Sequence, residues 1–376
     1  MAENENTPVD VFFSSSTQQY ISKNLMAGDW WRSAQATFWR ADFWLPEGIV
    51  WQDIHTSVYD VLIYPMLLSV VILFFRYCCL EPLLLVPLAR AARINKKRVA
   101  LPVSNQILEL IYQQYQMKVP KGMLREACRL TGMTQRQAER WLRRRHSLVC
   151  LTKYDKFLDC GFKLVCHIIF AALGAIITLP KPWLWDTTLC WQGFPNHEAT
   201  PGIFWYYMII LGYYWAITIV ELPQAGVNDS TKAMMILHHT LTIALVVFSW
   251  TCGLFRIGIL VIFVLEYADI ALLAAKVCKY SGLEKACEPL FIVFVVLWFL
   301  TRCCVLPFWI VRSVFFEPTW LTGYPVSYIL KGWMVALVML NMIWTGMVMR
   351  TVARKITGGG LQDVRSASDD SDTKAD

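Results

Sequence analysis

The stretch from Lys232 to Trp250 reads KAMMILHHTLTIALVVFSW. It is an apolar run close to the ~20 residues that a helix needs to cross the hydrocarbon core of a bilayer. Two adjacent histidines, His238 and His239, lie inside it. Titratable groups at that depth are costly, and they usually serve a function. The stretch therefore predicts a membrane-spanning helix that carries a candidate functional site.

Six further apolar runs of similar length predict an all-α polytopic membrane protein with seven transmembrane helices. They cover residues 58–79, 157–179, 203–221, 256–275, 289–311 and 328–350. Of the 376 residues, 56% are hydrophobic and only 17% are charged, whereas a soluble domain carries about 25% charged residues. The composition therefore excludes an ordinary soluble globular protein. The first fifty residues contain no apolar core of the signal-peptide type.

The distribution of basic residues predicts the orientation in the membrane. Residues 89–156 hold sixteen lysines and arginines against four acidic residues. Because cytosolic loops carry the excess of lysine and arginine, this loop is expected in the cytosol. The N-terminus is then lumenal and, with seven spans, the C-terminus is cytosolic.

The chain divides by composition into five parts. We expect a lumenal N-terminal segment, a first transmembrane helix, a cytosolic module, a catalytic membrane domain and a polar cytosolic tail, at 1–57, 58–79, 97–150, 153–355 and 356–376. The tail is rich in serine and aspartate, which predicts disorder. Ser366 has an acidic residue three positions on and is a candidate phosphorylation site, although a plain solvated tail is an equally good interpretation.

Residues 104–146 predict three helices that resemble a homeodomain. Gly132 breaks the pattern, Thr134 is a good N-cap for the third helix, and an arginine run follows Trp141. A homeodomain reads DNA through an asparagine in that helix, and Arg144 stands in its place. Specific DNA binding is therefore not expected. The basic face could instead contact anionic lipid headgroups or the phosphates of coenzyme A.

The twelve cysteines show no spacing typical of zinc, and no metal site is expected. The adjacent histidines would point about 100° apart on a helix, so both can rarely bind one ion. Cys190 and Cys252 both fall on the predicted lumenal side, where a disulfide could join them.

Two carboxylates in the next span lie at the depth of the histidines. His238 is six residues from Lys232, or about 9 Å into the membrane, and Asp269 is seven residues from Lys276, or about 10 Å. Glu266 lies one turn deeper on the same face. A carboxylate beside an imidazole orients it and raises its basicity. The group suits acyl transfer with a histidine as base or acyl carrier, although simple pairing of two helices is the alternative.

The order of motifs along the chain resembles ceramide synthases of the TLC-domain (Lag1) family. The motifs that carry the resemblance are Trp183-Leu184-Trp185, Cys190-Trp191, Met235-x-x-His238-His239-x-x-Thr242, Arg256-x-Gly258, Asp269 with Ala274-Ala275-Lys276, and Leu306-Pro307-Phe308-Trp309 through Glu317. The match runs from about Trp44 to Asp372.

The resemblance implies N-acylation of a sphingoid base, sphinganine or sphingosine, by a fatty acyl-CoA in the endoplasmic reticulum membrane. No cofactor is expected beyond this co-substrate. The expected partners are the two substrates and membrane lipids, and the protein could form a homo- or heterodimer. The family's catalytic residues map to His238, His239, Glu266 and Asp269. The segment linked to acyl-chain choice maps to about 312–327, with Arg312, Phe316, Glu317 and Trp320 as candidates.

The chain departs from the family pattern at two places. Ser230-Thr231-Lys232 replaces the usual basic residue, aspartate and phenylalanine, and Leu265-Glu266 replaces the usual His-Asp. The second change loses a histidine and lengthens the acid by one methylene. These departures keep open a non-catalytic TLC-type protein that binds or senses lipid. A membrane-tethered transcription regulator is a third interpretation.

Overall fold

The computed structural model describes residues 32–33, 36–96, 101–117, 119–148, 151–222 and 230–357, and the regular secondary structure of these residues is helical. Seven helices are long and apolar enough to cross a membrane, which confirms the predicted all-α polytopic class. They are Val58–Ala91 (α3, Val58–Phe74; η2, Phe75–Leu85; α4, Val86–Ala91), α8 (Lys153–Thr178), α9 (Pro201–Glu221), α10 (Ser230–Thr251), α11 (Phe255–Ser281), Glu284–Phe316 (α12, Glu284–Trp298; η6, Phe299–Val311; α13, Arg312–Phe316) and α14 (Pro325–Ile356). Ser366 lies outside the described residues.

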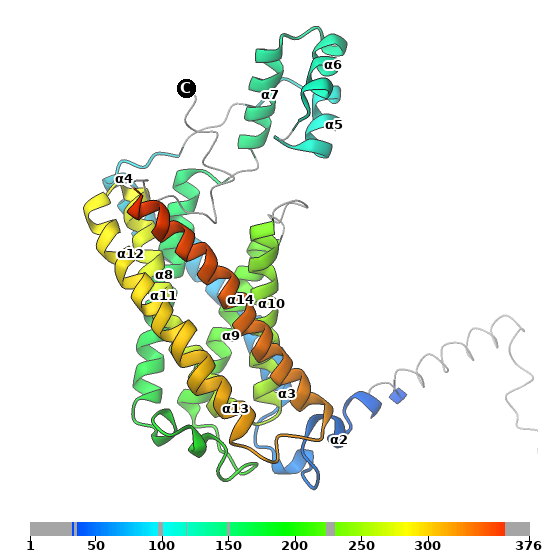
Figure 1. The fold of residues 1–376 in the computed structure, drawn as a ribbon, viewed down its shortest axis with the longest axis vertical. Coiled ribbons are helices and arrows are strands. Elements are labelled where there is room, and N and C mark those ends of the chain that lie inside the picture. The colour runs from blue at the N-terminus through cyan, green and yellow to red at the C-terminus, as the bar shows by residue number, and fades with distance from the viewer. Residues whose placement is uncertain are drawn as a thin grey trace, which may run out of the picture.

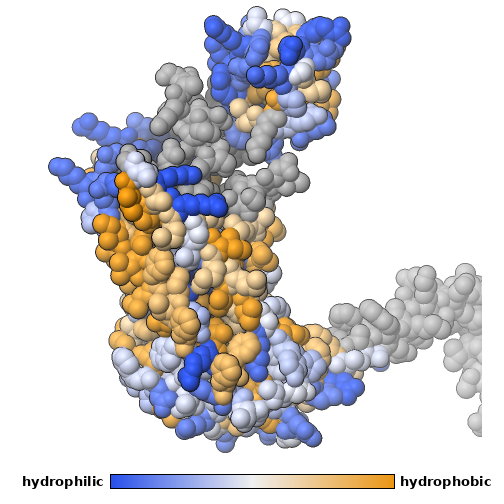
Figure 2. All heavy atoms as spheres, in the orientation of Figure 1, coloured by the Kyte–Doolittle hydropathy of each residue, from blue (hydrophilic) through white to orange (hydrophobic). Residues whose placement is uncertain are grey.

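The spans form one bundle. Figure 2 shows a band of hydrophobic residues on its outer surface, along the helices. Helix α11 is central and packs against α8, α10, α12 and η6, while α3 packs along α9. The short helix α2 (Ala41–Trp44) lies at one end of the bundle, which we call the α2 end (Figure 1). The C-terminal end of α14 lies at the opposite end. We call that end the module end, because the three helices between residues 106 and 147 lie beyond it.

Helices α3 and α9 approach closely because one of them carries a glycine at the contact. A Cβ atom added to Gly212 of α9 would lie 2.9 Å from the Cβ of Leu68 and 3.1 Å from the carbonyl oxygen of Pro65. Both neighbours belong to α3. Small residues at such contacts allow the close backbone packing that holds membrane helices together.

Two spans widen into π-type turns, and each of these stretches holds a buried arginine. Arg76 lies in η2 and Arg302 in η6, and a proline follows each of them within the same stretch. The first helical run continues to Ala91, beyond the end of the predicted span 58–79. The wider turns keep the backbone helical past these prolines, and such turns recur at functional sites.

The disulfide that the sequence left possible at the α2 end does not form. Cys190 and Cys252 are both free buried thiols. The Cys190 thiol lies 3.7 Å from the carbonyl oxygen of Trp183, and the Cys252 thiol lies 3.7 Å from that of Trp44. Location on the same side of the membrane does not fix the sulfur–sulfur distance that a disulfide requires.

The three helices of the module have a hydrophobic core of their own. They are α5 (Gln106–Tyr115), α6 (Lys121–Thr131) and α7 (Gln135–Ser147), and they bury Leu108, Ala138 and Trp141 between them. Gly132 ends α6 with φ +67°, and the Thr134 hydroxyl accepts a hydrogen bond from the amide of Gln137, as the predicted N-cap requires.

One face of α7 is strongly basic. It exposes the arginines whose spacing of three and four residues places them on one face, namely Arg136, Arg140, Arg143 and Arg144. Arg145 turns instead toward α5, where it donates two hydrogen bonds of 2.8 Å to the carboxylate of Glu109. The hydrogen bond from Arg145 lowers the pKa of Glu109 below its ordinary value of 4.5.

We predict that Glu109→Gln destabilises the isolated module, residues 101–148, by roughly 1 kcal/mol at neutral pH. Because the pKa of Glu109 is lower in the folded state, its contribution is present above pH 4.5 and is lost as the pH falls through the folded value. Thermal unfolding followed by circular dichroism should thus separate the two proteins at pH 7, and the difference should shrink as the pH is lowered below 4.5. The control Glu126→Gln removes an exposed pair with Arg129 and should change little. Equal stability at pH 7 would contradict the assignment.

Candidate active site

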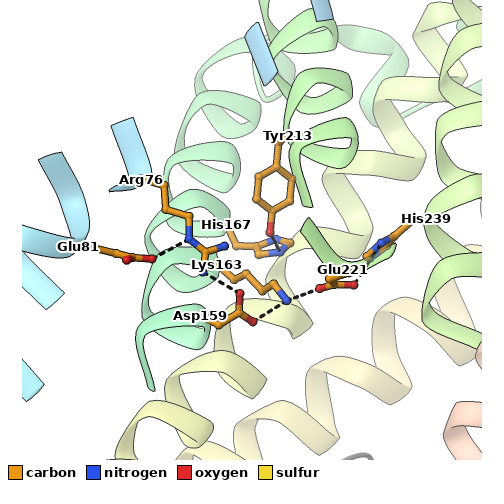
Figure 3. A network of polar contacts seen from close by, with 8 residues as sticks. All are labelled: Arg76, Glu81, Asp159, Lys163, His167, Tyr213, Glu221 and His239. Atoms are coloured by element: carbon orange, nitrogen blue, oxygen red, sulfur yellow. Dashed lines mark hydrogen bonds and ion pairs between the residues drawn. The ribbon is translucent and has the colours of Figure 1, made fainter. Parts of the chain in front are cut away.

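His238 and His239 occupy neighbouring positions on α10 and face different surroundings. The rings of the pair lie 5.9 Å apart, centroid to centroid. His239 is only 3% exposed, and its ring points toward Glu221 of α9 (Figure 3). His238 lines a cavity on the other side, where its ring meets that of Trp344 at 4.9 Å. The pair therefore stands between two parts of the bundle.

The cavity beside His238 has an empty volume of about 890 Å³ and is mostly apolar. Its walls come from α10, α11, η6 and α14. The ionisable residues of its lining include His238, Glu266, Asp269 and Arg302, and Tyr214 of α9 lines it as well. Trp191 and Leu321, from the loops of the α2 end, line it too. We call it the apolar cavity. Charged groups and aliphatic side chains therefore line the same cavity.

Asp269 is held by a buried arginine from η6. Arg302 donates a hydrogen bond of 2.6 Å to the Asp269 carboxylate and one of 3.1 Å to the carbonyl oxygen of Leu265. It donates another, of 3.1 Å, to Asn341 of α14, and its guanidinium lies 4.5 Å from the centre of the Trp298 ring. Three helices thus converge on one cation, whose charge the carboxylate balances.

Glu266 is held by a histidine that the sequence analysis missed. Nδ1 of His167, on α8, lies 2.5 Å from the Glu266 carboxylate, and the Tyr213 hydroxyl lies 3.3 Å from Nε2 of the same ring. His167 is buried. A histidine inside the predicted span 157–179 was the available signal, since such groups are rare in membrane helices.

A second set of charged side chains extends away from His239, beginning with Glu221 (Figure 3). Lys163 of α8 donates a hydrogen bond of 2.6 Å to Glu221, and its ammonium lies 2.7 Å from Asp159. Arg76 bonds to Asp159 at 3.2 Å and to Glu81 at 2.8 Å. These side chains, His239 excepted, border another cavity, with an empty volume of about 1300 Å³. We call it the polar cavity.

The structure brings together three of the four predicted catalytic residues. His238, Glu266 and Asp269 all line the apolar cavity, as their matching depths led us to expect. The carboxylate recorded beside His239 differs from the expected ones, since Nδ1 of this ring lies 3.6 Å from Glu221. Glu266 and Asp269 bond to His167 and Arg302. These partners come from α8 and η6, which spacing along α10 and α11 could not reveal.

The candidate residues for acyl-chain choice divide into two groups. Arg312 and Phe316 are exposed, with Phe316 at 78%, and neither lines the apolar cavity. Glu317 accepts a hydrogen bond of 3.1 Å from the Trp191 indole, and Trp320 lies 6.1 Å from that ring. Both therefore fix Trp191, which lines the cavity. From the same stretch, Val314 and Leu321 line it directly.

No group of three or more His, Cys, Asp or Glu side chains that could hold a metal ion occurs among the residues that the structure describes. The side chains that line the apolar cavity include imidazole, carboxylate and guanidinium groups. Imidazole can accept a proton or an acyl group. The carboxylates and Arg302 can orient polar atoms that enter the apolar cavity.

We predict that Arg302→Met destabilises the protein by about 2 kcal/mol, because it removes the charge-assisted hydrogen bond to the partly buried Asp269 carboxylate. Thermal unfolding of the purified protein, followed by tryptophan fluorescence, measures the effect. The double change Arg302→Met with Asp269→Leu should recover part of the loss. Arg312→Met removes an exposed arginine one helical segment away and serves as the control. Equal stability of Arg302→Met and this control would contradict the assignment.

Comparison with known proteins supports a family assignment for the whole membrane region. Residues 156–350 match the model of the TLC domain shared by TRAM, LAG1 and CLN8 proteins. The chain is similar to ceramide synthase 3 of Mus musculus, with 28% identity over 88% of this chain and 87% of the relative. It is 29% identical to ceramide synthase 3 of Homo sapiens, over 89% and 88% of the two chains. For ceramide synthase 4 of Bos taurus the identity is 29%, over 91% and 88%. The chain therefore belongs to the TLC-domain family.

Proposed function

We propose that this protein transfers a fatty acyl group from acyl-CoA to the amino group of a sphingoid base, which yields ceramide or dihydroceramide. The apolar cavity is the observation that carries the proposal, because it joins His238 to a compartment with aliphatic walls. Similarity to ceramide synthases over nearly the full length supports it. The membrane of the endoplasmic reticulum is the proposed location.

The acyl chain occupies the apolar cavity in this proposal, and the thioester lies beside His238. The lining of this cavity is predominantly apolar with a few polar groups, which is the composition of a site that takes an apolar chain with a polar head. Burial of the chain removes each CH₂ group from water, which contributes about 0.8 kcal/mol per group. The charged groups of the lining then face the carbonyl, where charge develops during transfer.

His238 is the proton acceptor or the transient acyl carrier of the reaction. As a base, it takes a proton from the amine as the nitrogen attacks the thioester carbonyl. As a carrier, its ring nitrogen receives the acyl group first and the amine then displaces it. Asp269, held by Arg302, and Glu266, held by His167, present fixed carboxylates to the same space. Fixed groups need no reorganisation as the charge changes.

The module end faces the cytosol in this proposal, and the α2 end faces the lumen. The sixteen basic residues between positions 89 and 156 lie in the loop that carries the module. This orientation opens the polar cavity toward the compartment that supplies acyl-CoA. The highly charged coenzyme then needs no passage across the membrane.

We predict that His238→Ala lowers the rate of ceramide formation by about 100-fold or more, because the reaction loses its base or carrier. His239→Ala should lower it less, and the double variant should show no activity. Mass spectrometry of the product from purified protein, acyl-CoA and sphinganine measures these rates. The control His55→Ala removes an exposed histidine of the α2 end that bonds to Asn196. Full activity of the double variant would favour the non-catalytic lipid-binding alternative.

We predict that Val314→Phe shifts the preference toward shorter acyl chains, because the larger side chain fills part of the apolar cavity near the α2 end. The measurement is the product distribution from an equimolar panel of acyl-CoAs. Phe316→Val alters an exposed side chain outside the cavity and should leave the distribution unchanged. An unchanged distribution for Val314→Phe, in an active and folded protein, would contradict the placement of the chain.

A further inference from the structure

N-acylation of a sphingoid base releases a proton that must leave a buried site. The amine enters as an ammonium ion at neutral pH, like the side chain of lysine. A carbon–nitrogen bond forms, the carbon–sulfur bond of the thioester breaks, and the nitrogen gives up two protons. The leaving thiolate takes one of them to become a thiol. One proton per turnover therefore remains on the protein, and the next cycle requires its removal.

The histidine pair lies between the apolar cavity and the carboxylate of Glu221, which lines the polar cavity. His238 lines the apolar cavity, and the His239 ring lies 5.9 Å from it. Nδ1 of His239 is 3.6 Å from Oε2 of Glu221, a gap that a small side-chain rotation closes to a hydrogen bond. Glu221 lines the polar cavity and is 24% exposed, whereas the His239 side chain is 4% exposed.

From these contacts we propose that Glu221 takes the released proton from the histidine pair and passes it to water in the polar cavity. The proposal rests on the proposed function. The proton moves from a ring nitrogen of His239 to the Glu221 carboxylate, which becomes neutral and then loses the proton to solvent. No oxidant or other reactant is needed. Glu221 is thus a relay residue that acts through His239 and does not touch the substrate.

The surroundings of Glu221 suit a carboxylate that gains and loses a proton. Lys163 fixes one of its oxygens at 2.6 Å, which leaves the other toward His239. About 420 Å³ of the polar cavity is accessible to the centres of water molecules, which is room for several waters. Its charged lining, which faces Glu221 from three other spans, consists of Arg76, Glu81, Asp155, Asp159, Lys163 and Lys276. The ring of Tyr214 covers His239 from α9.

A purely structural role for Glu221, as the partner of Lys163, predicts a different outcome from that of a relay. Lys163 is also paired with Asp159 at 2.7 Å, so Glu221→Gln leaves the lysine with one carboxylate. The variant should therefore fold. A small diffusible base such as imidazole could reach the polar cavity and accept the proton in place of Glu221. It could not restore a lost structural contact.

The test measures ceramide formation by the full-length protein in lipid nanodiscs, with sphinganine and the acyl-CoA that the wild type uses best. We expect Glu221→Gln to lower kcat by about tenfold or more. Its KM values should stay within about twofold of those of the wild type. Added imidazole, at constant pH and ionic strength, should raise the rate of this variant with increasing concentration and leave the wild type unchanged. Glu221→Asp keeps a carboxylate and should retain most of the activity.

Glu288→Gln is the matched control, because Glu288 is an exposed glutamate of the same end that pairs with Lys355. It should behave as the wild type does. Undiminished activity of Glu221→Gln, or a loss of activity that imidazole does not relieve, would overturn the relay. The proposed function would still be upheld if the wild type forms ceramide. Absence of ceramide from the wild type would overturn both.

Discussion

Charge pairing inside an apolar bundle is the constraint on which this structure depends. A lone ion moved into such surroundings costs several kcal/mol, so it must find a partner at close range. Arg302 with Asp269, His167 with Glu266, and Lys163 with two carboxylates meet this need. Each pair joins different turns or different spans. The pairs therefore fix the relative positions of the helices and, with them, the shapes of the two cavities.

The same constraint separates two environments on either side of the histidine pair. One side offers aliphatic walls, which suit a chain that is insoluble in water. The other offers charged side chains and room for water. A reaction between an acyl thioester and an ammonium ion needs both, because its reactants are apolar at one end and its by-product is a proton. In this account, adjacent residues on one helix reach both sides since they point about 100° apart.

The sequence was informative about properties that are local. Hydropathy predicted the seven spans, and the cost of burying titratable groups singled out His238, His239, Glu266 and Asp269. The partners could not be predicted in this way. His167 lies 99 positions from Glu266, and Arg302 lies 33 positions from Asp269, so only the packing of the helices brings them together. The possible disulfide between Cys190 and Cys252 could not be decided from the sequence for a related reason, because location on the same side of the membrane does not fix the distance between two sulfurs.

Some of the missed residues were nonetheless visible as anomalies. Arg76, Lys163, His167 and Arg302 all lie within the runs that predicted spans, where charged or titratable groups are rare. Each of these residues predicts a polar or charged partner inside the bundle, although the sequence does not indicate which residue that partner is. Glu221 ends such a run, where a charge is ordinary, and only its position between Lys163 and His239 distinguishes it.

The most direct test of the central claim is a structure of the protein with a non-reactive thioether analogue of acyl-CoA. The account predicts the acyl chain in the apolar cavity, with its end toward Trp191, and the atom that replaces the carbonyl carbon beside the His238 ring. An acyl chain bound outside this cavity, or a head group remote from His238, would contradict it.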